Sequence, residues 1–492
     1  MLMFTAALAL LSPAAPRAWA DSNAPPVGLD QVVHAALARE GIPPEHAALA
    51  LFSHERGRYL LLWRERELMT AASNAKLVTS FAALRLLSPD FRWRTPIYLV
   101  EQHDGPDTPA RQGLYVRGSG DPSLSEARLD AMARHIRAAG VTRIDGGLVF
   151  DTSLFEEPTP PAQGDPDWAL APVNPYIVND NAVAFTLLRQ DDGQPYSVVT
   201  DLPDDAVEVV SNLAAAAGVD ARIVVRQRWS PEGVRFTLSG ELDRAHPTYW
   251  VTATVQQPVQ YYFLLLRHAL RRAGIAGQMP LQPRQGEFAR VKRVYLDTSD
   301  PLRILLERIN KDSSNVAAEA LLRTIALRGK AAGVNAGDGL AGVRELLRQD
   351  FPQAWEEVSL VDGAGLNRES RVSPLFLVKL LNRIHNYPTF SHEFISSLSI
   401  SGWDGTLRYR DFPPRLAGRI RAKTGSLSGV QNISGYLQVF REQVVFSFMI
   451  DGVPRGTERL QEAQERILTD IYDHLVQSQA PERPAKQPIV RN

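Results

Sequence analysis

Residues 72–79 read ASNAKLVT, and in this stretch Ser73 and Lys76 stand three positions apart. From this point the apolar residues recur with the period of a helix, at Leu77, Phe81 and Leu84. Side chains three apart on a helix lie on one face, so the Ser73 hydroxyl and the Lys76 amine are expected to face each other. The stretch therefore predicts a helix that carries a hydroxyl beside an amine.

Lysine is scarce in this chain. Only seven of its 54 basic residues are lysines, and Lys76 and Lys423 are two of them. An arginine guanidinium keeps its proton in a protein, whereas a lysine amine can lose it. Lys423 opens Lys423-Thr424-Gly425, and Ser313-Ser314-Asn315 lies between the two lysines in chain order. Together these elements form the S-x-x-K, S-x-N and K-T-G set of serine acyl-transfer enzymes that act on penicillin and peptidoglycan.

The residue types in this set suit nucleophilic catalysis. A serine hydroxyl is a poor nucleophile until a base takes its proton, and Lys76 is placed to be that base for Ser73. Burial and a nearby cation, Lys423, are both expected to lower the pKa of the Lys76 amine. Ser313 is expected to pass a proton to the leaving amine, although adjacent Ser314 leaves the choice of hydroxyl open. Asn315 is expected to hold Lys76 or the substrate amide.

The other requirements of acyl transfer also have candidates. The backbone N–H groups of Ser73 and Ser426 are candidates for the two donors that an oxyanion requires. A substrate carboxylate is expected to bind Lys423 and the hydroxyls of Thr424 and Ser426. Gly425 has no Cβ, so a substrate backbone can lie close to the strand.

Composition excludes several other classes of protein. With 492 residues, 44% of them hydrophobic, the chain is expected to form two or three domains with a sizeable core. A net charge of −1 without a long basic run argues against a nucleic-acid partner. The ten histidines are scattered and cysteine is absent, so no metal, no cofactor and no disulfide is expected.

The first twenty residues have the layout of a secretory signal. An apolar run over residues 4–11 precedes Ala18-Trp19-Ala20, a small-x-small triplet that predicts cleavage after Ala20. No later stretch reaches the roughly 18 consecutive apolar residues of a spanning helix. We therefore expect a signal peptide over residues 1–20, an exported protein, and no integral membrane segment in the mature chain.

Apolar and polar residues alternate over 47–52 and 59–63, and again over 432–440 and 443–450. These four strands can share one antiparallel sheet although the pairs are far apart in the chain. Helical patterns occur at 302–309, 316–327 and 457–476, and the last carries an apolar stripe, with acidic residues around it, that is expected to pack on the sheet. The sequence therefore predicts an α+β protein whose antiparallel sheet is flanked by helices.

The interval from about 95 to 290 changes character and contains a strand-rich stretch of its own, which predicts one insertion nested in another. The expected division is as follows: a discontinuous catalytic domain at 21–95 and 291–477, a first inserted domain at 96–180 and 253–290, a second at 181–252, and a disordered tail at 478–492.

Beyond the three motifs, several strings resemble those of the class C low-molecular-mass penicillin-binding proteins, the D-alanyl-D-alanine carboxypeptidase/endopeptidase family (peptidase family S13). They are 72–79 (ASNAKLVT), 114–124 (LYVRGSGDPSL), 150–155 (FDTSLF), 361–374 (VDGAGLNRESRVSP), 402–407 (GWDGTL) and 422–427 (AKTGSL). Members of this family also have a gap of about 240 residues between the first two motifs, and two inserted domains fill it. In this chain the gap runs from Ser73 to Ser313.

This resemblance implies a serine β-lactamase/transpeptidase-like domain interrupted by two inserted domains. It implies that Ser73 is acylated by peptidoglycan stem peptides and by penicillins, and that the protein acts in the periplasm as a D-Ala-D-Ala carboxypeptidase or DD-endopeptidase. Asp151, in the 150–155 string, matches the inserted-domain position that the resemblance implies binds the diaminopimelate amino group. One departure is Ser314, where Asp or Asn is commoner. A homodimer is left open.

Two alternatives remain at this point. A serine β-lactamase uses the same three elements but adds a glutamate that activates the deacylating water, and no E-x-x-L-N string lies between Asn315 and Lys423. The chain could also be a catalytically silent peptidoglycan-binding protein of the same fold. Labelled penicillin separates the silent protein from an enzyme, because a silent protein forms no covalent adduct at Ser73.

Overall fold

The computed structural model describes residues 28–102, 110–156, 171–190, 196–200, 202–203, 206–282, 288 and 290–479. The predicted signal peptide lies outside these residues, as does the predicted tail from residue 480. Residues 478 and 479 belong to the last helix, so the chain stays helical two residues beyond the expected start of the tail.

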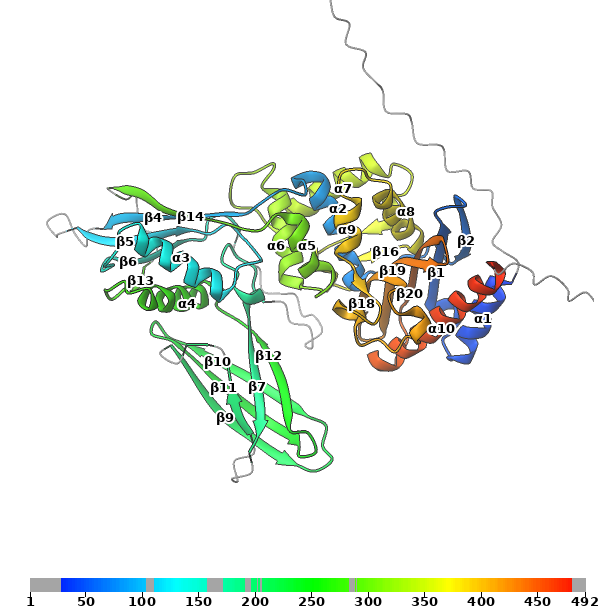
Figure 1. Cartoon of the computed structure of the whole chain (residues 1–492), viewed down its shortest axis with the longest axis horizontal. Coiled ribbons are helices and arrows are strands. Elements are labelled where there is room, and N and C mark those ends of the chain that lie inside the picture. The colour runs from blue at the N-terminus through cyan, green and yellow to red at the C-terminus, as the bar shows by residue number, and fades with distance from the viewer. Residues whose placement is uncertain are drawn as a thin grey trace, which may run out of the picture.

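A six-stranded antiparallel sheet forms the centre of the larger part of the molecule (Figure 1). Its order is β17 (Ser399–Ile400), β18 (Ile420–Leu427), β19 (Val430–Val439), β20 (Glu442–Ile450), β1 (Ala47–Ser53) and β2 (Arg58–Trp63). Strand β1 pairs with β20, with Leu49 opposite Phe448. The prediction that strands from both ends of the chain share one antiparallel sheet is therefore confirmed.

The alternation of side chains along β1 separates two cores. Ala48, Ala50 and Phe52 join a cluster with helices on one face, whereas Leu49 and Leu51 join a cluster on the other. The first face carries α2 (Ala75–Leu87), α5 (Leu302–Asn310), α6 (Asn315–Ala326), α7 (Ala336–Asp350), α8 (Pro374–His385) and α9 (Ser391–Ser396). The second carries α1 (Leu29–Arg39) and α10 (Thr457–Gln479), whose apolar stripe packs on the sheet as expected.

The segment between α2 and α5 first forms a five-stranded sheet covered by two helices (Figure 1). The strand order is β13 (Leu281–Gln282), β6 (Gly147–Asp151), β5 (Arg111–Arg117), β4 (Arg94–Gln102) and β14 (Val291–Thr298), and the helices are α3 (Glu126–Ala138) and α4 (Pro258–Arg272). Strand β14 pairs with β4, so residues 291–298 belong with this sheet. The sequence analysis placed the return to the catalytic domain at residue 291, because the local sequence of a strand does not reveal which sheet it joins.

Two three-stranded sheets follow within this segment. One has the order β12 (Thr248–Thr254), β7 (Ala182–Arg189) and β8 (Tyr196–Val199), and the other β10 (Arg222–Trp229), β11 (Val234–Asp243) and β9 (Val207–Ala216). Phe185 of the first contacts Phe236 of the second. Their core is continuous with that around α4, which includes Phe263. The division of residues 96–290 into two domains stays a prediction.

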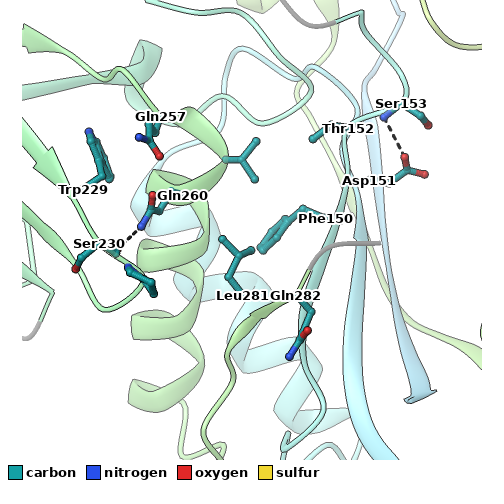
Figure 2. A pocket seen from close by; sticks show the side chains of 12 residues that line it. Phe150, Asp151, Thr152, Ser153, Trp229, Ser230, Gln257, Gln260, Leu281 and Gln282 are labelled. Atoms are coloured by element: carbon teal, nitrogen blue, oxygen red, sulfur yellow. Dashed lines mark hydrogen bonds between the residues drawn. The ribbon is translucent and has the colours of Figure 1, made fainter. Parts of the chain in front are cut away.

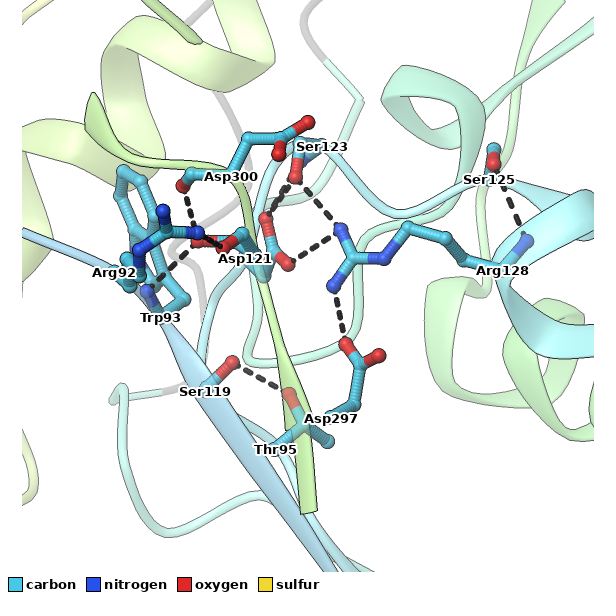
Figure 3. A network of polar contacts seen from close by, with 11 residues as sticks. Arg92, Trp93, Thr95, Ser119, Asp121, Ser123, Ser125, Arg128, Asp297 and Asp300 are labelled. Atoms are coloured by element: carbon cyan, nitrogen blue, oxygen red, sulfur yellow. Dashed lines mark hydrogen bonds and ion pairs between the residues drawn. The ribbon is translucent and has the colours of Figure 1, made fainter. Parts of the chain in front are cut away.

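Two chain crossings connect this segment to the central sheet and its helices, and polar contacts link them (Figure 3). The Trp93 N–H donates to the Ser299 hydroxyl at 3.0 Å, and the Ser299 N–H donates to the Trp93 carbonyl at 3.1 Å. Nearby, Arg128 of α3 forms ion pairs with Asp121, at 2.9 Å, and with Asp297 of β14. A carboxylate from each of two separate segments is thus tied to one guanidinium at the crossing.

A small sheet lies directly before the predicted nucleophile. It contains β15 (Val358–Ser359), β16 (Arg371–Val372) and β3 (Met69–Thr70). The Ala71 N–H donates to the Ser370 carbonyl at 2.8 Å. This hydrogen bond fixes the chain two residues before Ser73. None of the helices among the described residues combines the length and apolar character needed to cross a membrane.

Candidate active site

Ser73 lies on a short 3-10 turn, Ala72–Asn74, that leads into α2. The turn begins with Ala72 at φ 43°, an uncommon left-handed conformation for a residue with a Cβ. Gly365, at φ 77°, packs against it so closely that a Cβ there would lie 1.8 Å from the Ala72 carbonyl oxygen. A strained turn held from a second segment is typical of an active-site nucleophile.

Lys76 lies in the first turn of α2 and is fully buried. Its Nζ donates to the Ser73 Oγ at 2.8 Å, to the Asn315 Oδ1 at 2.7 Å and to the Ala364 carbonyl at 2.9 Å. The predicted contact between the hydroxyl and the amine is therefore present. The two other partners hold the amine in line with Ser73.

Burial lowers the pKa of Lys76 to about 7, because the ammonium loses its hydration. The nearby charges that act on this amine are the Asp362 and Glu319 carboxylates, and both raise the pKa. The sequence expectation named burial and Lys423 as the two causes. In the structure, burial is the cause that lowers the Lys76 pKa, and the carboxylates oppose it.

The second pair joins Ser313 and Lys423. The Lys423 Nζ donates to the Ser313 Oγ at 2.8 Å and to the Thr424 carbonyl at 2.9 Å. Burial lowers the pKa of Lys423 well below its ordinary value, and the positive charges of Lys76 and Arg410 lower it further. Lys76 and Lys423 thus belong to one electrostatic site, which the sequence reasoning required.

The structure distinguishes the two adjacent serines. Ser313 has φ 59°, which turns its hydroxyl to Lys423. Ser314 caps α6, since its Oγ accepts from the Ala317 N–H at 3.0 Å, and it donates to Asp180 at 2.9 Å. Ser313 therefore carries the hydroxyl that contacts Lys423, whereas the Ser314 hydroxyl is bonded to the α6 N-terminus and to Asp180.

Strand β18 brings Thr424, Gly425 and Ser426 to the same place. A Cβ on Gly425 would lie 3.0 Å from the Ser73 backbone nitrogen, so the absent side chain lets β18 approach the Ser73 turn. The sequence reasoning assigned this freedom to the substrate, but the close neighbour in the structure is the protein itself. The Thr424 hydroxyl donates to Thr406 at 2.8 Å.

A cavity of about 610 Å³ opens over these groups. Five of the predicted residues line it: Ser73, Ser313, Asn315, Thr424 and Ser426. The inserted segment completes the wall with Ala171, Asp180, Thr252 and Thr254, none of which sequence reasoning found. A run of Asn and Asp at 179–181 adopts left-handed backbone conformations, as these residues tolerate, but no local pattern connects Asp180 to a serine 134 positions later.

Asp151 lies in a different cavity, of about 770 Å³, together with Phe150, Trp229, Gln257 and Gln260 (Figure 2). Its Oδ1 accepts from the Ser153 N–H at 3.0 Å, and the Tyr115 hydroxyl donates to its Oδ2 at 2.5 Å. The residue is only 6% exposed. The assignment of Asp151 to the diaminopimelate amino group stays a prediction.

The chain matches the D-Ala-D-Ala carboxypeptidase 3 (S13) family over residues 29–470. It belongs to this family. The family resemblance predicted from the sequence is therefore confirmed, and the match includes every residue of the site described above.

Two relatives and one solved structure illustrate the similarity. D-alanyl-D-alanine carboxypeptidase DacB of Haemophilus influenzae is 26% identical over 403 residues, which cover 79% of this chain and 81% of that protein. D-alanyl-D-alanine carboxypeptidase of Actinomadura sp. (strain R39) is 28% identical over 425 residues, or 82% and 75% of the two chains. The crystal structure of penicillin binding protein 4 (dacB) from H. influenzae superposes with a TM-score of 0.73 at 23% identity and covers 90% of this chain and 99% of that one. The fold class predicted from the sequence is confirmed.

Among the residues that the structure describes, no group of three or more His, Cys, Asp or Glu side chains is arranged to hold a metal ion. The groups that converge on Ser73 are amines, hydroxyls and an amide. This set suits proton transfer and hydrogen bonding to an acyl group.

Proposed function

We propose that this protein is a serine-type D-alanyl-D-alanine carboxypeptidase that acts on peptidoglycan stem peptides through an acyl-enzyme, and that penicillins acylate the same serine. The observation that carries the proposal is the 2.8 Å contact between the buried Lys76 amine and the Ser73 hydroxyl, at the base of a cavity of about 610 Å³. Membership of the S13 family supports the substrate class.

In the proposed acylation step, the neutral Lys76 amine takes the proton of Ser73 while the Ser73 Oγ attacks the carbonyl carbon of the penultimate D-alanine. The resulting oxyanion accepts hydrogen bonds from the backbone N–H groups of Ser73 and Ser426. Asn315 holds the Lys76 Nζ in line during the transfer, as its 2.7 Å contact supports.

Collapse of the intermediate breaks the C–N bond, and the leaving nitrogen takes a proton. Ser313 is the proposed relay for this proton, with Lys423 at 2.8 Å behind it. Relay groups of this kind typically contribute about 10² to 10⁴ in rate. The proton that Lys76 took from Ser73 goes to the leaving nitrogen through this relay, so Lys76 is neutral again. Water then attacks the Ser73 ester and gives a proton to Lys76, which passes it to the Ser73 Oγ as the ester bond breaks.

The leaving group decides which activity results. A terminal D-alanine has a carboxylate, which we place against Lys423, Thr424 and Ser426 on the edge of β18, because charge-assisted hydrogen bonds are strong. A cross-linked amine in the same place would make the reaction a DD-endopeptidase cleavage. Asp151 is proposed, from the family resemblance, to bind the diaminopimelate amino group.

Three measurements test this function: covalent labelling by penicillin, release of D-alanine, and cleavage of a cross-linked dimer. Labelled penicillin is expected to bind covalently to the protein and not to Ser73→Ala, and an adduct that survives in the variant would overturn the proposal. Release of D-alanine from a pentapeptide is compared with cleavage of a cross-linked dimer on purified muropeptides. A serine β-lactamase would instead deacylate penicillin rapidly, and a silent peptidoglycan-binding protein would form no adduct.

The setting of the protein is part of the proposal. We propose export by the segment 1–20 and action in the periplasm, where peptidoglycan lies. The division into a discontinuous catalytic domain and two nested inserted domains is proposed with one change, since β14 pairs with the first inserted sheet. A homodimer stays an open alternative, to be measured by sedimentation.

A further inference from the structure

One face of the β12-β7-β8 sheet points away from the core of the inserted segment. Tyr249, Val251 and Ala253 of β12 pack in the core, so the alternate side chains at 248, 250, 252 and 254 point outward. The pairing extends this face over β7 and β8, because Trp250 lies opposite Thr186, and Thr186 opposite Val199.

The outward face is uncharged. We call its ten residues the Thr/Trp platform: Thr248, Trp250, Thr252, Thr254, Ala182, Ala184, Thr186, Leu188, Ser197 and Val199. Five of them carry a hydroxyl and none is ionisable, although 22% of the chain is charged. A surface of this composition suits a neutral ligand that offers hydrogen-bonding groups, and it does not suit an anionic lipid or a nucleic acid.

Trp250 is 79% exposed, and the apolar side chains of Val199 and Leu188 on the same face are 49% and 37% exposed. Exposed apolar groups gathered on one face, rather than scattered singly, mark a binding surface. A pyranose ring has an apolar C–H face and a rim of hydroxyl and amide groups. An indole can stack on the apolar face of the sugar, and threonine hydroxyls can form hydrogen bonds with the hydroxyl and amide groups of its rim.

The platform is continuous with the catalytic cavity. Thr252 and Thr254 belong to both, and Trp250 lies about 7 Å along the strand from Thr252 at the usual rise of a β-strand. Strands β7 and β12 lie on the side of the inserted segment that is turned towards β18 (Figure 1). A ligand that continues from the cavity along β12 therefore meets the Trp250 ring.

We propose that the Thr/Trp platform binds the N-acetylated sugar strand of peptidoglycan while the stem peptide attached to that strand occupies the catalytic cavity. This inference rests on the proposed function, because it concerns the same substrate. The choice of a saccharide follows from the uncharged face, its five hydroxyls and the shared wall at Thr252 and Thr254. The sugar strand would thus contribute to affinity through residues that do no chemistry.

The test compares two substrates that differ only in the sugar: a free pentapeptide, and the same pentapeptide on its glycan strand. Trp250→Ala is expected to lower kcat/KM about tenfold on the glycan-bearing substrate, mainly through KM, and to leave the free peptide unchanged. Trp250→Phe should recover part of the loss. Phe440→Ala, which removes another exposed aromatic side chain in the β19–β20 hairpin outside the cavity, is the matched control.

A second measurement separates this proposal from the proposed function. Ser73→Ala protein, which cannot be acylated, is expected to bind peptide-free glycan strands, and adding Trp250→Ala should weaken that binding about tenfold. Equal effects of Trp250→Ala on both substrates, or no effect on glycan binding, would overturn the platform. So would a dimer that dissociates in Trp250→Ala while glycan binding is unchanged, because the face would then be a subunit interface.

Discussion

The base role of Lys76 predicts a specific failure of Lys76→Arg. The wild-type amine has a pKa of about 7, so about half of it is neutral at pH 7 and about one-tenth at pH 6. An arginine at this position stays protonated at both pH values. Lys76→Arg should therefore lose the contribution of a general base, about 10² to 10⁴ in rate, and be nearly as inactive as Lys76→Ala.

The assay is the second-order rate constant for acylation by a fluorescent penicillin, measured from pH 5 to 9. For the wild type, the logarithm of this rate should rise by about one per pH unit below pH 7 and level off above it, because the neutral amine is the reactive form. Lys379→Arg is the matched control, since Lys379 pairs with Glu357 and neither residue lines the catalytic cavity. Thermal unfolding checks that each variant is folded.

Two results would refute this reasoning. One is retention by Lys76→Arg of more than about a tenth of the wild-type acylation rate at pH 7. The other is a wild-type profile that is flat between pH 5 and 8. Either would mean that the proton of Ser73 leaves by another route, although Lys76 lies 2.8 Å from its oxygen.

Further predictions concern the rest of the site. Ser313→Ala should slow acylation by about 10² or more, whereas Ser314→Ala should lower stability by about 1 kcal/mol through loss of the α6 cap and keep acylation within tenfold; the reverse order would exchange their roles. Burial lowers the pKa of Lys423, and only the protonated amine can form an ion pair with a substrate carboxylate. KM for a peptide with a free C-terminus should therefore rise as pH rises, and KM for its C-terminal amide should not. Parallel pH profiles for the two peptides would exclude carboxylate binding by Lys423. Asp151→Ala should raise KM for diaminopimelate-containing peptides more than for lysine-containing ones, and equal effects would discard that assignment.

Much of the fold could be predicted because its signals are local. The helix after Ser73 and the strands of the central sheet show their periods within a few residues, and the matching patterns predicted that strands from both ends of the chain share one sheet. The partner of β14 could not be predicted in this way. Its local sequence does not specify a partner strand, and the long-range pairing with β4 made the choice.

The contact between Ser73 and Lys76 was also predictable, since S-x-x-K places its two groups on one helical turn and requires no tertiary information. The choice between Ser313 and Ser314 was not. It depends on a left-handed backbone at Ser313 and on Asp180, which approaches Ser314 from the inserted segment. The carboxylates that oppose the lowered pKa of Lys76, Asp362 and Glu319, likewise come from separate parts of the chain.

The sequence by itself predicted the groups that we propose carry the chemistry, namely a serine and a lysine one helical turn apart and a second lysine on a strand edge. Only the tertiary structure decided what surrounds them: the burial that brings the Lys76 pKa to about 7, and the wall that Asp180, Thr252 and Thr254 add to the cavity. The physical reason is the distance along the chain over which each effect acts. Helical and strand spacing act over a few residues, whereas desolvation and cavity shape depend on every segment that packs around the site.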